Sequence, residues 1–148
     1  MIKVYAAGVW DLFHYGHLNL LLKAKELGDH LTVGVCADER VEVYKGMAPV
    51  INYEDLAAII NQIKCVDRVV KYKERYNVKQ IGELDIDIIV HGTDWENMLP
   101  AELEDTLEKL NLQMEFIPYT KRVSTSSIKK HIIDNYRNIL CNLAKRSR

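Results

Sequence analysis

The chain has 148 residues, a length that fits one folded domain with a substantial buried core. Hydrophobic residues make up 48% of it and charged residues 28%, which excludes a disordered or fibrous protein. The formal net charge of -1 gives no electrostatic reason to expect nucleic acid or a membrane surface as a partner.

Short apolar runs alternate with helical patterns from one end of the chain to the other. Strands are predicted at residues 2–9, 31–37, 67–72, 87–90 and 114–117. The first helix is predicted to end at Gly28, which we interpret as its cap with Asp29. Further helices are predicted at about residues 53–63, 78–84, 101–110 and 125–143. The polar stretch 38–52 contains Lys45, Gly46 and Pro49 and is predicted to be a loop.

Five strands, each with a crossover long enough for a right-handed parallel connection, predict a Rossmann-like α/β fold. We expect a doubly wound five-stranded parallel sheet with helices on both faces, as a single domain over residues 1–148. Ligands of such sheets bind beyond the carboxyl ends of the strands, where the strand order reverses. A polar cluster that directly follows a strand is therefore a candidate site.

The cysteines Cys36, Cys65 and Cys141 are odd in number and widely spaced, without a C-x-x-C pair. This pattern argues against a disulfide framework and a zinc site, and indicates buried free thiols in a reducing compartment. The sequence has no apolar run of 18 residues and does not begin like a secretory leader. We expect a cytoplasmic protein that does not insert into membranes.

The segment 8–17 directly follows the first predicted strand and carries two histidines, His14 and His17, at a helix entry. A spacing of three places both imidazoles on one helix face, and Gly16 between them lets a ligand approach the backbone. Helix N-termini favour phosphate, and two imidazoles there could donate hydrogen bonds to phosphate oxygens. Two surface histidines, or a zinc pair lacking a third ligand, are the alternatives.

Four hydroxyl residues, 124–127, follow the fifth predicted strand and open the last helix. One such residue is enough for an N-cap, so capping is the plain interpretation of the run. The preceding Lys121 and Arg122 also make it suitable for the outer phosphates of a nucleoside triphosphate.

A third candidate, residues 91–95, follows the fourth strand and combines a carboxylate, a glycine and an aromatic ring; it could also be a simple turn. Lys45, after the second strand, is a weaker candidate because most lone lysines are solvated. The sequence has no P-loop, no G-x-G-x-x-G fingerprint and no G-x-S-x-G elbow. A P-loop kinase and a dinucleotide-dependent dehydrogenase are thus not supported.

Over about residues 2–133 the chain resembles the cytidylyltransferases, most closely the short bacterial glycerol-3-phosphate cytidylyltransferases. The signature G-x-x-D-x-x-H-x-G-H is complete, as Gly8, Asp11, His14, Gly16 and His17. Further matches are residues 23–29, 37–39, Lys45 with Pro49, 53–54, 66–67, Gly92 with Asp94 and Trp95, and Ser124 with Thr125.

The resemblance implies that CTP and a phosphomonoester give a CDP-linked product and pyrophosphate, by direct in-line attack with Mg²⁺ and no covalent intermediate. His14, His17 and Lys45 would be the catalytic residues, with Lys45 and Lys64 holding the acceptor. Asp11 and Asp67 are the metal candidates, although Mg²⁺ would be held mainly by the triphosphate. The nucleotide-binding residues would be Gly8, Val9, Trp10, Asp11, Gly16, His91, Gly92, Asp94, Trp95, Thr120, Arg122, Ser124, Thr125 and Ser126.

Three family arginines are replaced in this chain, by Leu56, Lys64 and Tyr119. Lysine keeps the charge but loses the planar fork that grips phosphate, and leucine keeps neither. Lys121 or Arg122 could substitute at the third position. Because the changes concern the acceptor more than the triphosphate, the acceptor could be glycerol 3-phosphate, a sugar phosphate, a phosphoamino alcohol or a phosphorylated amino acid.

Two alternatives remain at the level of the sequence. Adenylyltransferases share the same H-x-G-H chemistry, so the nucleotide could be ATP. A nucleotide-binding regulatory module that has lost its activity is the non-enzyme alternative. Family resemblance also implies a homodimer and gives no nucleic-acid partner.

Overall fold

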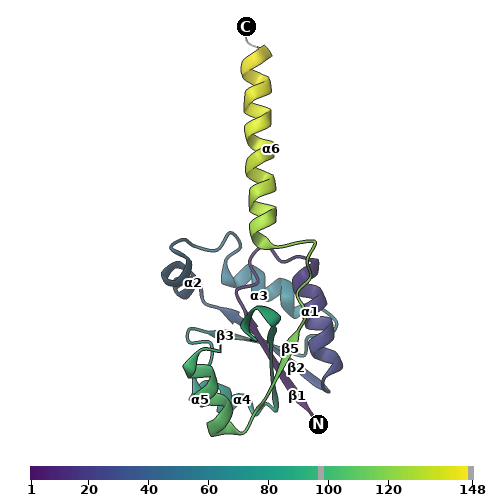
Figure 1. Cartoon of the computed structure of the whole chain (residues 1–148), viewed down its shortest axis with the longest axis vertical. Coiled ribbons are helices and arrows are strands. Elements are labelled where there is room, and N and C mark those ends of the chain that lie inside the picture. Colours follow the sequence, from purple (N-terminus) through teal and green to yellow (C-terminus); the bar gives the residue numbers. More distant parts are fainter. Residues whose placement is uncertain (97–98, 147–148) are drawn as a thin grey trace.

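The computed structural model describes residues 1–96 and 99–146, with side chains described as far as residue 141. Its strands are β1 (Lys3–Gly8), β2 (His30–Cys36), β3 (Arg68–Tyr72), β4 (Ile88–Gly92) and β5 (Gln113–Ile117). All neighbouring strands run parallel, in the order β3-β2-β1-β4-β5. The predicted doubly wound α/β fold is confirmed (Figure 1).

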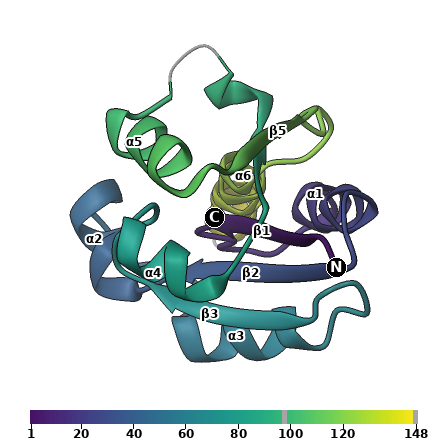
Figure 2. The ribbon, with the colours of Figure 1, turned by 90° about the horizontal axis from the view of Figure 1, so that it is seen from below.

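Helices cover both faces of the sheet (Figure 2). The main ones are α1 (Tyr15–Glu26), α3 (Tyr53–Asn61), α4 (Val78–Leu84) and α5 (Ala101–Leu110). Side chains alternate along β1, so that Val4 and Ala6 join the core with α1 and α3. Tyr5 and Ala7 point the other way, into the core with α4 and α5. Burial on both faces explains why this strand is apolar throughout.

The order of the strands fixes where a ligand can bind. From the central β1 the chain adds β2 and β3 on one side, then crosses to add β4 and β5 on the other. The connections that leave the carboxyl ends of β1 and β4 therefore diverge and leave a crevice between them. The N-terminus of α1 lies at this crevice, directly after β1.

Residues 38–45, predicted to be loop, form a helix, α2 (Asp38–Lys45). Only Val41 of this helix is buried, so no apolar periodicity announces it in the sequence. Two local features stabilise it: Asp38 lies in the first turn, and Gly46 ends it in the left-handed conformation at φ 70°. The correction matters because Lys45 is the last residue of a helix and not a loop residue.

Gly28 is not the C-cap that the sequence predicted. Helix α1 ends at Glu26, and its C-cap is Leu27 with an ordinary φ of -83°. A β-carbon at Gly28 would lie 2.7 Å from the carbonyl oxygen of Ile2 and 2.7 Å from a methyl of Val4. The glycine is needed for close packing against the start of β1. The other predicted boundaries differ by a few residues; β4, for example, includes His91 and Gly92.

The last helix, α6 (Thr125–Arg146), projects away from the sheet (Figure 1). It is longer than predicted, and every side chain from residue 130 to 141 is exposed. Among the described residues, no helix is both long and apolar enough to cross a membrane.

The three cysteines are free, but only one of them is buried as the sequence predicted. Cys36 is buried, Cys65 is half-buried and Cys141 is exposed on α6. The prediction of burial fails for Cys141 because α6 projects from the domain and its side chains from residue 130 to 141 are exposed.

Candidate active site

The loop between β1 and α1 has an unusual backbone. Trp10 and Leu12 both adopt positive φ angles, 60° and 51°, which residues other than glycine rarely do. The indole N–H of Trp10 donates to the carbonyl of Gly34 at 2.8 Å, and this buried bond anchors the turn. Backbone conformations of this kind concentrate at functional sites, where the surrounding structure holds them in place.

Between these two residues, Asp11 links three separate segments of the chain. Its Oδ1 accepts hydrogen bonds from the backbone N–H groups of Val50 and Ile51, at 3.0 and 3.1 Å. Its Oδ2 pairs with Lys129 on α6 at 3.1 Å, and its carbonyl accepts from the hydroxyl of Thr125 at 2.8 Å. Desolvation acts to raise the pKa of Asp11, but these hydrogen bonds and Lys129 hold it below its usual value.

His14 and His17 stack face to face, with ring centroids 3.8 Å apart. His14 caps α1: its Nδ1 accepts a hydrogen bond from the backbone N–H of Gly16 at 3.0 Å. The neutral ring must therefore carry its proton on Nε2, which makes Nε2 the available donor. The predicted placement of both imidazoles on one face at a helix start is confirmed.

Both imidazoles are held in the neutral form. Burial lowers the pKa of His17 to about 3, helped by the nearby His14 and Lys45, and desolvation also lowers that of His14. The buried Nδ1 of His17 has no hydrogen-bond partner. At neutral pH these side chains can thus act as hydrogen-bond donors but not as cations.

A cleft of about 250 Å³ opens at the crevice and brings together side chains predicted from three segments. It is lined by Gly8, Val9, Trp10 and His17 after β1, by Lys45 of α2, and by His91, Gly92, Asp94 and Trp95 from β4 onward. A smaller hollow of about 100 Å³ adjoins it and includes His14, Gly16 and Thr120. The prediction that these segments meet at one edge of the sheet is therefore confirmed in space.

The segment after β4 forms a stacked pair. The rings of His91 and Trp95 lie 4.0 Å apart at 21°, and Asp94 lies on the exposed side of the pair with Oδ1 3.7 Å from His91 Nδ1. Burial, with a contribution from Arg75, lowers the pKa of His91 to about 4. A flat, neutral aromatic surface beside a carboxylate is suited to contact with a nucleobase.

At the start of α6 the hydroxyl residues have different surroundings. Ser124 exchanges capping hydrogen bonds with Ser127, so capping accounts for Ser124. Thr125 binds Asp11, as described above, and Ser126 is exposed. Arg122 lies over the ring of Tyr15 at 4.6 Å, near the start of α1.

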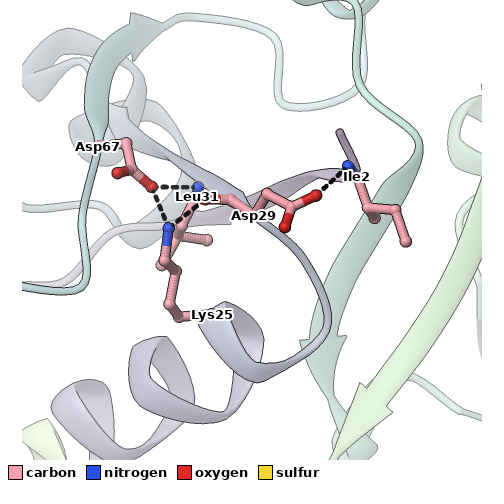
Figure 3. A network of polar contacts seen from close by, with 5 residues as sticks. All are labelled: Ile2, Lys25, Asp29, Leu31 and Asp67. Atoms are coloured by element: carbon pink, nitrogen blue, oxygen red, sulfur yellow. Dashed lines mark hydrogen bonds and ion pairs between the residues drawn. The ribbon is translucent and has the colours of Figure 1, made fainter.

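The lining of the cleft and of the adjoining hollow does not include the predicted residues Asp11, Arg122, Ser124, Thr125 and Ser126. Two further predicted residues lie at another edge of the sheet. Asp67 and Lys64 precede β3 and so lie at its amino end, opposite the edge where His14 and His17 are found. The Oδ2 of Asp67 accepts from Lys25 Nζ at 2.6 Å and from the N–H of Leu31 at 2.7 Å (Figure 3). Its contacts tie α1 to β2 and β3. Within the described part of the chain, no three His, Cys, Asp or Glu side chains gather to hold a metal ion.

The replaced family positions have different surroundings. Leu56 is a residue of α3 that points into the core and is 2% exposed, whereas Tyr119 lines the cleft. The cleft also contains two residues that sequence reasoning missed, Tyr44 and Arg75. Arg75 lies three residues after the end of β3, so its position after a strand was a usable signal.

A family model described as cytidylyltransferase-like matches residues 5–131. The glycerol-3-phosphate cytidylyltransferase of Bacillus subtilis is 37% identical over 133 residues, which cover 89% of this chain and 98% of the relative. A FAD synthase of Thermococcus sibiricus is 35% identical over 141 residues, covering 91% of this chain and 95% of the relative.

The solved structures include a similar protein of about the same size. The crystal structure of a lipopolysaccharide core biosynthesis protein from Thermoplasma volcanium aligns with a TM-score of 0.67 and 32% sequence identity. The alignment covers 83% of this chain and 99% of that chain.

Proposed function

Because this chain belongs to the cytidylyltransferase-like family and is a nucleotidyltransferase, we propose that it transfers CMP from CTP to a small phosphomonoester. The products would be a CDP-linked compound and pyrophosphate. The observation that carries the proposal is the stacked pair of neutral imidazoles, His14 and His17, at the N-terminus of α1, beside the cleft that also contains Lys45.

The chemistry needs little from the protein beyond position and charge stabilisation. The acceptor phosphate attacks the α-phosphate in line, and negative charge grows on the oxygens of that phosphorus. Nε2–H of His14 and the imidazole of His17 donate to these oxygens, and the N-terminus of α1 adds its partial positive charge. Lys45 contributes the full positive charge, from the end of α2.

The nucleotide would lie along the β4 side of the cleft. In this proposal the His91–Trp95 stack and Asp94 receive the base and ribose, near Gly8 to Asp11 and Gly92. Thr120, Arg122 and residues 124–126 receive the outer phosphates at the start of α6. Mg²⁺ would arrive bound to the triphosphate.

ATP is the second candidate, because relatives named FAD synthase match the chain nearly as well as the B. subtilis enzyme does. FAD contains an AMP unit, so its synthesis calls for an adenylyl donor. The neutral stack of His91 and Trp95 would serve either base. We further propose a homodimer, which light scattering would test by giving twice the mass of 17.1 kDa.

A direct test measures pyrophosphate release with CTP or ATP, Mg²⁺ and a panel of phosphomonoesters that includes glycerol 3-phosphate. We expect CTP to support release and to raise the melting temperature more than ATP does. Chelation of Mg²⁺ should abolish release. Pyrophosphate release with ATP but not with CTP would make ATP the nucleotide substrate. No release with any combination of nucleotide and phosphomonoester would overturn the proposal.

A further inference from the structure

Arg75 is a half-buried cation without a carboxylate partner among the described residues. It lies in the turn between β3 and α4, with its guanidinium 5.7 Å from the ring centroid of Tyr72 and 5.2 Å from that of Trp95. Its Nε donates to the hydroxyl of Tyr72 at 3.1 Å. In the described parts of the chain, no carboxylate comes within 4.0 Å of it.

A guanidinium presents five N–H donors in a rigid planar fork. Burial of such a charge is unfavourable unless an anion and further acceptors compensate it. The hydroxyl of Tyr72 accepts from one of these donors only. The remaining donors are therefore free to bind an anionic ligand that enters beside Tyr72.

Beside Arg75 lies another cavity, of about 200 Å³, which shares no lining residue with the hollow around His14. Its walls are mainly apolar and aromatic, and include Val9, Val41, Tyr44, Tyr76, Trp95 and Pro100. The side chain of Tyr76 is only 2% exposed, and its buried hydroxyl has no hydrogen-bond partner. Two charged side chains, Arg40 and Glu102, also line this cavity, and both are exposed residues.

Arg75 belongs to both spaces. It lines the cleft that contains His17 and Lys45, and it lines the apolar cavity as well. A phosphomonoester could thus place its phosphate between Lys45 and Arg75 and its organic part against the apolar walls.

We propose that Arg75 binds the phosphate of the acceptor and that the cavity beside it takes an acceptor with an apolar or aromatic body. The inference rests on the proposed function and narrows its acceptor. A glycerol body would leave apolar walls in contact with its hydroxyl groups. An acceptor with a quaternary ammonium group does not fit this cavity. Such a group binds to free faces of aromatic rings, and here the guanidinium of Arg75 already lies over the rings of Tyr72 and Trp95.

Calorimetric titration of the full chain tests this without requiring turnover. The probes are phenyl phosphate, which has an apolar ring, and glycerol 3-phosphate, which has a small polar body. We expect phenyl phosphate to bind at least tenfold more tightly. R75M should weaken its binding at least tenfold, R75K should weaken it less, and Y76F should weaken it several-fold.

The matched control is R68M, because Arg68 is an exposed arginine at the opposite, amino end of β3. It should leave the Kd unchanged. Tighter binding of glycerol 3-phosphate, or a Kd within twofold of wild type in R75M, would overturn the proposal. If R75M fails to fold, an unchanged Kd in both R75K and Y76F would do so. A third outcome separates the two proposals. If phenyl phosphate binds in an Arg75-dependent way but no acceptor supports pyrophosphate release in the assay above, the proposed function is wrong and the phosphate site at Arg75 remains.

Discussion

The half-buried ring of His17 is surrounded by other aromatic rings. Its ring packs against Trp10 and Phe13 and stacks on His14, which leaves little room for water around a charged imidazolium. The neutral form still donates one hydrogen bond, and it avoids the repulsion between a charged imidazolium and the nearby Lys45. The pair is thus prepared for phosphate without needing protonation.

Removal of either imidazole should slow the reaction and not merely weaken substrate binding. We expect His14→Ala and His17→Ala each to lower kcat at least a hundredfold, the usual effect of losing one donor to a developing oxyanion. The measurement is pyrophosphate release at saturating nucleotide. His131→Ala on exposed α6 is the control. Unchanged kcat in both variants would remove these residues from the chemistry.

The pKa of about 3 for His17 also predicts how stability depends on pH. Between about pH 3 and 6.5 the unfolded chain binds a proton at this position and the folded chain does not, so acidification favours unfolding. From pH 7 to pH 5, wild type should lose about 1–2 kcal/mol more unfolding free energy than His17→Gln. Urea denaturation at the two pH values measures this, and equal losses would contradict it.

At the level of single residues, the sequence predicted those whose chemistry is written in a motif. His14 and His17 were found because two imidazoles at a helix entry are informative by themselves. Arg75 was missed because Lys73 and Glu74 beside it resemble an ordinary solvated loop. Its partial burial depends on Tyr72 at the end of β3 and on Trp95, which follows β4 and meets Arg75 only in the folded chain.

Among the elements, the junction at Asp11 holds together the loop after β1, the segment at Val50 and Ile51, and the start of α6. These segments have no secondary-structure pairing with one another. The carboxylate of Asp11, which is 3% exposed, thus connects these segments through polar contacts. Its removal would leave two backbone donors and Lys129 without their acceptor.

We therefore expect Asp11→Ala to lower the unfolding free energy by about 3 kcal/mol, as loss of one partner of a buried ion pair does. Urea denaturation measures the effect. Asp105→Ala is the control, because its ion pair with Lys109 lies on the exposed side of α5 and should contribute little. A loss as small as that of the control would mean that the segments are held by other contacts.

The sequence predicted the central strands well because burial on both faces makes β1, β2 and β4 short, mainly apolar runs. Helix α2 escaped prediction for the opposite reason: with Val41 as its one buried residue, it has no apolar face to recognise. Gly46 was seen as a loop residue, although its left-handed conformation ends that helix. Capping chemistry, and not hydrophobic pattern, determines this element.

For the molecule as a whole, strand order determines which predicted residues can meet. Asp67 matched the family and Lys64 stands where the family has an arginine, yet residues that precede a parallel strand lie at the edge opposite to those that follow one. The same criterion that selected His14, Lys45 and Asp94 would have separated these two from the site. Sequence similarity alone did not carry that information, whereas the direction of the chain through the sheet does.

Most of α6 lies outside the packed domain, so its removal should have little effect on stability. We expect a chain that ends at residue 133 to melt within about 2 °C of wild type and to keep its kcat, because residues 130–141 are exposed. Thermal unfolding and pyrophosphate release test this. A chain that ends at residue 123, which also loses Thr125 and Lys129, should be clearly destabilised. A large loss already at residue 133 would show that α6 is covered in solution.

The unequal burial of the thiols has a practical consequence. Burial raises the pKa of Cys36 and of Cys65, which keeps both as unreactive thiols, while Cys141 is exposed on α6. A maleimide dye added near neutral pH should therefore attach to Cys141 first, without mutation of the other two. Because α6 projects from the sheet (Figure 1), a label near the end of this helix would sit away from the sheet, and it could anchor the protein to a surface with the substrate cleft left open.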